Sequence, residues 1–358
     1  MAARLGGDGF HLGVLLVLGG SILAGYLGLV VMRRWHVCDV LFLLLVGVVL
    51  GPVLGVVSGD VLAPAIPFLA PLGLMVALFE GGLQLAWEDV RRFAGPAVAM
   101  CVAAWVLTAC SIAIIATIVF GLPPHLSFLF GLAVCATGTL GVLPMLSGLS
   151  APPEARVLLT AEAGLGGILS SVATAAVAAM YVSHASPVSG AFLLGYTFLV
   201  GASVGLLAGV LWARALDALT SERHGYALTL AALVTSYVAA ETLGGSGLLM
   251  ALTFGLFVGN APALVRHGGL RALSPLAPQM RLHQSELIFI LRSVYFVYLG
   301  LIVAPAIFTW PYLLAGAMLA ASLLAARVVA VAATRRRGAD RATDALLVAM
   351  TPRGLTAA

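Results

Sequence analysis

Apolar residues occur along this chain in runs that are long enough to cross a lipid bilayer. A helix needs about 20 consecutive, mostly apolar residues to span the hydrocarbon core. Runs of this kind begin near residues 10, 37, 64, 95, 125, 155, 189, 225, 245, 283, 308 and 343. The pattern predicts twelve helical segments, of which the ninth (245–260) is short and the twelfth is cut off by the chain end at Ala358.

The composition supports an all-α polytopic membrane protein. Of the 358 residues, 62% are hydrophobic and only 9% are charged, whereas an ordinary soluble domain has roughly 25% charged residues. So few charges cannot cover the surface of a water-soluble chain of this length, which excludes soluble enzymes and nucleic-acid-binding proteins as the main interpretation. We expect one transmembrane domain over residues 1–358, surrounded by the lipid bilayer, with no soluble domain.

The distribution of arginine predicts the topology. The net charge is +4, every basic residue is Arg, and the loops near 58–63, 121–125, 183–188, 243 and 305 contain none. Fourteen of the eighteen Arg fall in the alternate loops: Arg33, Arg34, Arg91, Arg92, Arg156, Arg214, Arg223, Arg266, Arg271, Arg281, Arg335, Arg336, Arg337 and Arg341. Because short loops rich in Arg stay cytoplasmic, we expect the N-terminus outside and these loops inside the plasma membrane. Twelve spans would leave the C-terminus outside directly after an apolar run, which predicts that a thirteenth helix is missing by truncation.

Ionisable residues inside the predicted spans are the first candidates for function, because a charge in hydrocarbon costs at least a few kcal/mol. The sequence places seven there: Glu80, Glu162, Glu241, Glu286, Arg292, Arg327 and Arg353. Glu80 either faces a water-filled cavity or extends toward the cytoplasmic end of its span. Glu162 lies about two turns inside its span, so it either forms a buried ion pair with an intramembrane Arg or takes a direct part in transport. Glu241 and Glu286 stand near span ends, where anchoring at the interface is expected.

Two predicted spans contain residues that interrupt helices. Residues 135–141 (CATGTLG) include Gly138 and Thr139, and residues 351–354 (TPRG) include Pro352 and Gly354. Pro and Gly weaken the helical hydrogen-bond ladder, and interrupted helices in transporters expose carbonyl groups that bind ions near the bilayer midplane. Two such helices far apart in the chain predict an inverted-repeat transporter. The Cys and His residues show no metal-ligand spacing, so no tightly bound metal is expected.

Five stretches, taken together and in order, resemble the sodium/proton exchanger family of monovalent cation:proton antiporters. They are residues 39–52 (DVLFLLLVGVVLGP), 78–83 (LFEGGL), 236–260 (SYVAAETLGGSGLLMALTFGLFVGN), 292–300 (RSVYFVYLG) and 351–357 (TPRGLTA). The resemblance implies an inverted-repeat fold with two crossing interrupted helices and a dimerisation domain, and hence a homodimer. It also implies exchange of Na⁺, K⁺ or Li⁺ against H⁺ by alternating access, without a cofactor.

The chain departs from the family at the ion site. The Thr-Asp-Pro of the family's fifth helix matches Thr137, Gly138 and Thr139. On the sixth helix, the positions of the Ser ligand, its Asn or Asp neighbour and the exchanging Asp match Ala163, Gly166 and Gly167. Antiport needs a group that can hold either a cation or a proton, and glycine can do neither.

The resemblance pairs Glu162 with Arg327, with Arg353 as the second choice. If Glu162 is occupied in this way, Glu80 is the best remaining acid for exchange, while Thr137 and Glu162 complete the expected site. The alternatives are a homologue that keeps the fold but acts as a regulator or sensor, and a transporter of a different solute.

A remote alternative is an intramembrane serine protease. Residues 244–247 (GGSG) contain Ser246, with His267 and His283 downstream. Such a short pattern arises easily in a chain rich in Gly, and a nucleophile needs its base within hydrogen-bond reach. We therefore expect a transporter and not an enzyme.

Overall fold

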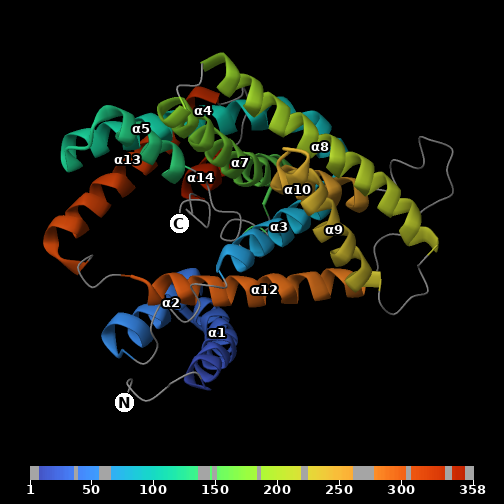
Figure 1. Ribbon diagram of the computed structural model, residues 1–358, viewed down its shortest axis with the longest axis horizontal. Coiled ribbons are helices and arrows are strands. Elements are labelled where there is room, and N and C mark those ends of the chain that lie inside the picture. The colour runs from blue at the N-terminus through green and yellow to red at the C-terminus, as the bar shows by residue number, and fades with distance from the viewer. Residues whose placement is uncertain are drawn as a thin grey trace. The chain divides into compact units, whose positions relative to one another are not determined.

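A computed structural model describes most of the chain (Figure 1). The described residues are 8–35, 39–55, 66–135, 146, 151–183, 187–218, 225–260, 278–303, 308–334 and 341–350. Their regular secondary structure consists of twelve α-helices and one π-helical segment. This confirms the predicted all-α class, and the α-helices correspond one to one with the twelve predicted segments.

The chain divides into two compact units, the first formed by Met1–Gly73 and Arg281–Leu314. This unit contains α1 (Asp8–Trp35), α2 (Asp39–Val48), the π-helical η2 (Val49–Val53) and most of α12 (Pro278–Leu301). Pro52 lies inside η2, where its missing N–H interrupts the regular ladder. α2 and α12 approach closely at Gly47 and Gly300, since a Cβ on Gly47 would collide with the Val297 carbonyl oxygen. Small residues permit such close contact between membrane helices.

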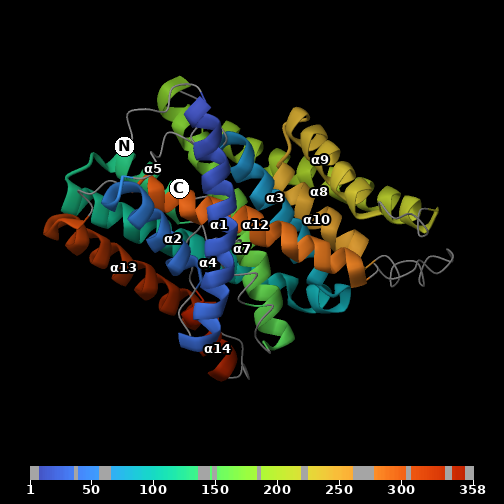
Figure 2. The ribbon, with the colours of Figure 1, turned by 90° about the horizontal axis from the view of Figure 1, so that it is seen from below.

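The second unit is formed by Leu74–Met280 and Ala315–Ala358. It contains most of α3 (Ile66–Gln84) and of α13 (Trp310–Thr334), together with α4 (Trp87–Phe120), α5 (Pro124–Val134), α7 (Pro153–Ser183), α8 (Pro187–Ala218), α9 (Gly225–Thr242), α10 (Gly247–Gly259) and α14 (Arg341–Ala349). α7 is its central helix, because it packs against α4, α5, α8, α10 and α14 (Figures 1 and 2).

Glycine lets α10 lie directly against its neighbours. α8 and α10 run side by side in both views of the ribbon (Figures 1 and 2), and Gly205 of α8 faces Met250 and Thr253 of α10. On another side of α10, a Cβ on Gly255 would collide with the carbonyl oxygen of Phe79 in α3. The backbones therefore touch at these points, and a larger side chain would force the helices apart.

Asn260 ties the end of α10 to the turn between α3 and α4. Its Nδ2 donates to the carbonyls of Leu85 at 2.7 Å and Leu256 at 2.8 Å, and its Oδ1 accepts from the N–H of Trp87 at 2.8 Å. Backbone groups at helix ends have no partner within their own helix. The buried Asn260 side chain thus hydrogen-bonds to backbone carbonyls near the C-terminal ends of α3 and α10 and to a backbone N–H at the start of α4.

The predicted boundary of the fourth segment was wrong. α4 begins at Trp87 and not near 95, so Arg91 and Arg92 lie in its first turns and not in a loop. Its 34 residues make a helix about 50 Å long, which exceeds the roughly 30 Å of the hydrocarbon core. The helix therefore continues through polar sequence beyond the apolar run. For the same reason other predicted loop arginines lie on helices, namely Arg33, Arg34, Arg156, Arg214, Arg281 and Arg341.

Five helices among the described residues are long and apolar enough to cross a membrane: 87–120, 153–178, 190–215, 284–301 and 310–334. α5 and α10 are shorter, with 11 and 13 residues. The prediction of a short ninth segment is thus confirmed by α10.

Candidate functional site

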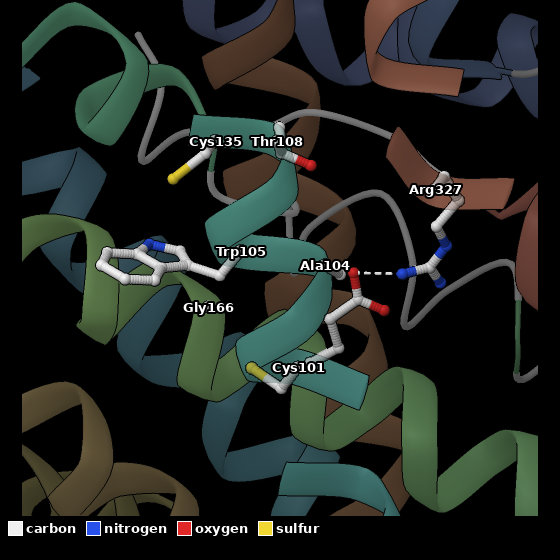
Figure 3. Close-up of a pocket in the computed structure, with 8 residues that line it drawn as sticks. Cys101, Ala104, Trp105, Thr108, Cys135, Gly166 and Arg327 are labelled. Carbon is white, nitrogen blue, oxygen red and sulfur yellow. Dashed lines mark ion pairs between the residues drawn. The ribbon is translucent and has the colours of Figure 1, made fainter. Parts of the chain in front are cut away.

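A buried ion pair lies at the centre of the second unit. Arg327 Nη1 of α13 lies 2.5 Å from Glu162 Oε1 of α7, and the two side chains are only 3% and 6% exposed (Figure 3). Arg327 Nε also donates to the carbonyl of Leu347 in α14, at 2.8 Å. Each buried charge depends on its partner, because an isolated charge loses its solvation without compensation. The pair connects α7, α13 and α14, and it is the pairing that the resemblance implies for these two positions.

A small cavity borders this pair. Its volume is about 10 Å³, which is close to the space that one water molecule needs. Four helices contribute to its wall: Cys101, Ala104, Trp105 and Thr108 come from α4, Cys135 from the end of α5, Glu162 and Gly166 from α7, and Arg327 from α13 (Figure 3).

The α4 side of the cavity follows from helical geometry. The four α4 residues have the spacing i, i+3, i+4 and i+7, which places them on one face of the helix. Ser170 of α7 fixes two of the lining side chains. Trp105 Nε1 donates to Ser170 Oγ at 3.1 Å, and the Cys135 thiol lies in hydrogen-bond contact with the same oxygen, also at 3.1 Å.

The sequence did not single out Trp105, Thr108 or Ser170. Each lies in an apolar run and carries no charge, so an intramembrane charge does not mark any of them. The available signal was the spacing on α4, where two polar side chains and a thiol share one face. The spacing indicates a site only once the structure shows that this face of α4 lines the same cavity as Glu162.

Several predicted site residues lie outside the described residues. They are Thr137, Gly138, Thr139, Pro352, Arg353 and Gly354, so both predicted helix interruptions remain predictions. α5 ends at Val134 with Cys135 as its C-cap, two residues before Thr137.

Glu80 lies apart from the lining of the cavity. It is half-buried near the C-terminal end of α3 and accepts a hydrogen bond from Gln84 Nε2 at 3.1 Å. It also interacts electrostatically with Tyr226 of α9. Among the described residues, the structure therefore groups Glu162 with Arg327 and leaves Glu80 in a separate environment.

The three α7 positions that the resemblance matches to the family's ion site are buried. Ala163 packs in an apolar cluster with Ala97, Leu159 and Val331. Gly166 lines the cavity, and the Gly167 carbonyl accepts a hydrogen bond from the Ser171 hydroxyl at 2.6 Å. No side-chain oxygen reaches the site from these three residues.

Ser246 and Glu241 have structural roles at the start of α10. Ser246 is the N-cap, and its hydroxyl oxygen accepts from the N–H of Leu249 at 3.3 Å. Glu241 is exposed, and its Oε1 accepts from the N–H of Gly247 at 2.8 Å. Both satisfy donors of the first helical turn, so Ser246 has a role without any protease chemistry. His267 lies outside the described residues.

Comparison with known proteins gives the family of this chain. The family model for sodium/hydrogen exchangers, transmembrane region, matches residues 19–357. The chain belongs to the sodium/hydrogen exchanger family. This family consists of membrane transporters and not of enzymes, and the chain described here is a multi-pass membrane protein.

Named relatives of this chain are antiporters. Na⁺/H⁺ antiporter 1 of Methanocaldococcus jannaschii is 25% identical over 264 residues, which make up 70% of this chain and 59% of that protein. The K⁺/H⁺ antiporter NhaP2 of Shewanella oneidensis is 26% identical over 205 residues, or 56% of this chain and 36% of that protein. The chain thus matches less than two thirds of the length of these curated relatives.

A solved structure shares the fold of this chain. The sodium proton antiporter MjNhaP1 from Methanocaldococcus jannaschii, at pH 8, superposes with a TM-score of 0.75 and 20% sequence identity. The match covers 96% of this chain and 84% of that one. It confirms the exchanger-type fold that the five sequence stretches implied.

Proposed function

We propose that this chain is a secondary active transporter that exchanges Na⁺ or K⁺ for H⁺ by alternating access. The observation that carries the proposal is a buried acid, Glu162, beside a water-sized cavity on the central helix of the second unit. Intramembrane carboxylates are costly and mark proton and ion pathways. Family membership and the names of the relatives support the same activity.

Two acids are assigned to the exchange. Arg327 neutralises Glu162 in the observed arrangement, so Glu80 is the first candidate to hold H⁺ and the cation alternately. Glu162 is the second candidate and would act after release from Arg327. Thr137 and nearby backbone carbonyls would supply oxygen ligands, which a dehydrated alkali cation requires.

The test is cation-dependent proton flux in proteoliposomes that contain the full chain. Na⁺, K⁺ and Li⁺ are supplied in turn, and the variants are Glu80→Gln and Glu162→Gln. Glu286→Gln is the matched control, because Glu286 is exposed near the start of α12. Exchange by the wild type, lost in one of the two variants and kept in the control, would support the assignment. Unchanged flux in both variants would overturn it.

A second candidate function is a homologue that has lost exchange and serves as a regulator or sensor, or that transports a different solute. The observation in its favour is the lack of side-chain oxygens at Ala163, Gly166 and Gly167. The same assay separates the two functions. The absence of exchange with every alkali cation, from mildly acidic to mildly alkaline pH, would favour the second candidate.

The proposal includes the setting of the transporter. Residues 1–358 act as one exchanger domain in the plasma membrane, without a cofactor, and assemble as a homodimer. The N-terminus lies outside, since Arg is concentrated at alternate predicted connections. Labelling of single introduced cysteines from either side of sealed vesicles tests this orientation.

A further inference from the structure

The Thr108 hydroxyl is a buried polar group directed into the cavity. Thr108 is 2% exposed and lies on the cavity face of α4. Figure 3 shows its oxygen pointing into the space between α4 and Arg327. Its backbone carbonyl accepts a hydrogen bond from Ser111, but within the described part of the chain nothing hydrogen-bonds to its side chain. A hydroxyl on the wall of a water-sized cavity is a suitable hydrogen-bonding group for a bound molecule.

The size and charge of the cavity select the ligand. About 10 Å³ accommodates a single water-sized molecule. The charges of Glu162 and Arg327 cancel. Among the described residues, the other ionisable groups that line the cavity are the thiols of Cys101 and Cys135. A bare cation would lie close to the Arg327 guanidinium without a net negative charge to balance it. A water molecule adds no charge and can bond to several polar groups at once.

We infer that the cavity binds one water molecule, which the Thr108 hydroxyl holds and which donates a hydrogen bond to the Glu162 carboxylate. Thr108 is then a positioning residue that acts on Glu162 through this water. The water gives the carboxylate a hydrogen bond that does not depend on Arg327, which eases its release from the ion pair. This last step rests on the exchange function proposed above, whereas the presence of the water does not.

The decisive variants are Thr108→Val and Thr108→Ser. Valine has nearly the shape of threonine but lacks the hydroxyl, while serine keeps it. Thr117→Val is the matched control on the same helix, because the Thr117 hydroxyl bonds to the Ala113 carbonyl at 3.0 Å and does not line the cavity. The wild type, these three variants and Glu162→Gln are prepared as the full chain in lipid nanodiscs.

The first readout is independent of transport. High-resolution cryo-EM should show density for one water between Thr108 and Glu162 in the wild type and in Thr108→Ser, but not in Thr108→Val. The infrared carboxylate band of Glu162, identified by its loss in Glu162→Gln, should shift in Thr108→Val and return in Thr108→Ser. An empty cavity in the wild type, or an unshifted band in Thr108→Val, would overturn the water site.

The second readout is exchange in proteoliposomes. A hydrogen bond to a charged group changes an equilibrium by about tenfold or more, so Thr108→Val should lower the exchange rate by about that factor. Thr108→Ser and Thr117→Val should retain the wild-type rate. Equal rates in the Thr108→Val variant and the wild type would refute the positioning role. If the wild type itself shows no exchange, the proposed function has failed, and the density and the infrared band still decide the water site.

Discussion

Removal of the guanidinium at position 327 should destabilise the second unit strongly. In Arg327→Met, the apolar side chain fits the buried position, but Glu162 keeps a charge that is nearly excluded from water. The Leu347 carbonyl also loses its donor. Loss of one partner from a buried ion pair lowers the free energy of unfolding by about 3–5 kcal/mol. The double variant Glu162→Leu with Arg327→Met removes both charges, so it should be near the wild type or more stable.

The assay is reversible unfolding in mixed detergent micelles, followed by tryptophan fluorescence, with Trp105 as a reporter in the cavity wall. Arg214→Met is the control, because Arg214 is exposed on α8 and its replacement should change stability by no more than about 0.5 kcal/mol. The double-mutant cycle should give a coupling of at least about 2 kcal/mol. A coupling near zero, with Arg327→Met as stable as the control, would refute the claim that the pair is electrostatically interdependent.

The same unfolding assay checks three further predictions. Asn260→Ala should cost about 3 kcal/mol, because three hydrogen bonds are lost at buried helix ends; a loss below that of a typical surface substitution would contradict this role. Gly255→Ala should destabilise by about 1–3 kcal/mol through the clash with a backbone carbonyl, whereas Gly316→Ala, with nothing within 4 Å of the new Cβ, should stabilise α13 by up to about 1 kcal/mol. The opposite order would refute the close-packing argument. Glu241→Gln should cost about 0.5–1 kcal/mol by removing a negative charge from the N-terminus of α10, and the loss should shrink at high salt.

The twelve helices could be predicted because the bilayer leaves few options. A spanning segment must satisfy its backbone hydrogen bonds internally, so a sufficiently long apolar run becomes a helix whatever its neighbours are. The predicted starts near 125 and 225 agree with α5 and α9 to within a residue. The predicted start of the fourth helix was wrong, because α4 already begins at Trp87. Polar residues continue this helix outside the hydrocarbon, and the apolar run alone does not indicate where they begin it.

The site was only partly predictable. Glu162 could be identified from the sequence alone. An acid deep in an apolar run is costly, so it indicates either a buried ion pair or a functional site. The residues alone left its partner open, and the resemblance favoured Arg327 over Arg353. The roles of Glu241 and Ser246 as caps of α10 were not foreseen, since an acid or a hydroxyl near a span end also fits anchoring at the membrane surface.

The amino-acid sequence by itself determined the helical class, the order of the segments and the family, because these depend on local hydrophobicity and on contiguous motifs. Tertiary structure alone decided which face of α4 meets α7, and thereby placed Thr108, Cys101 and Trp105 around Glu162. Residues 162 and 327 are far apart in the chain, and their contact arises only when the fold brings the Arg327 side chain of α13 within reach of Glu162 on α7. Packing between distant helices depends on the fit of whole surfaces, and no local pattern along the chain encodes that fit.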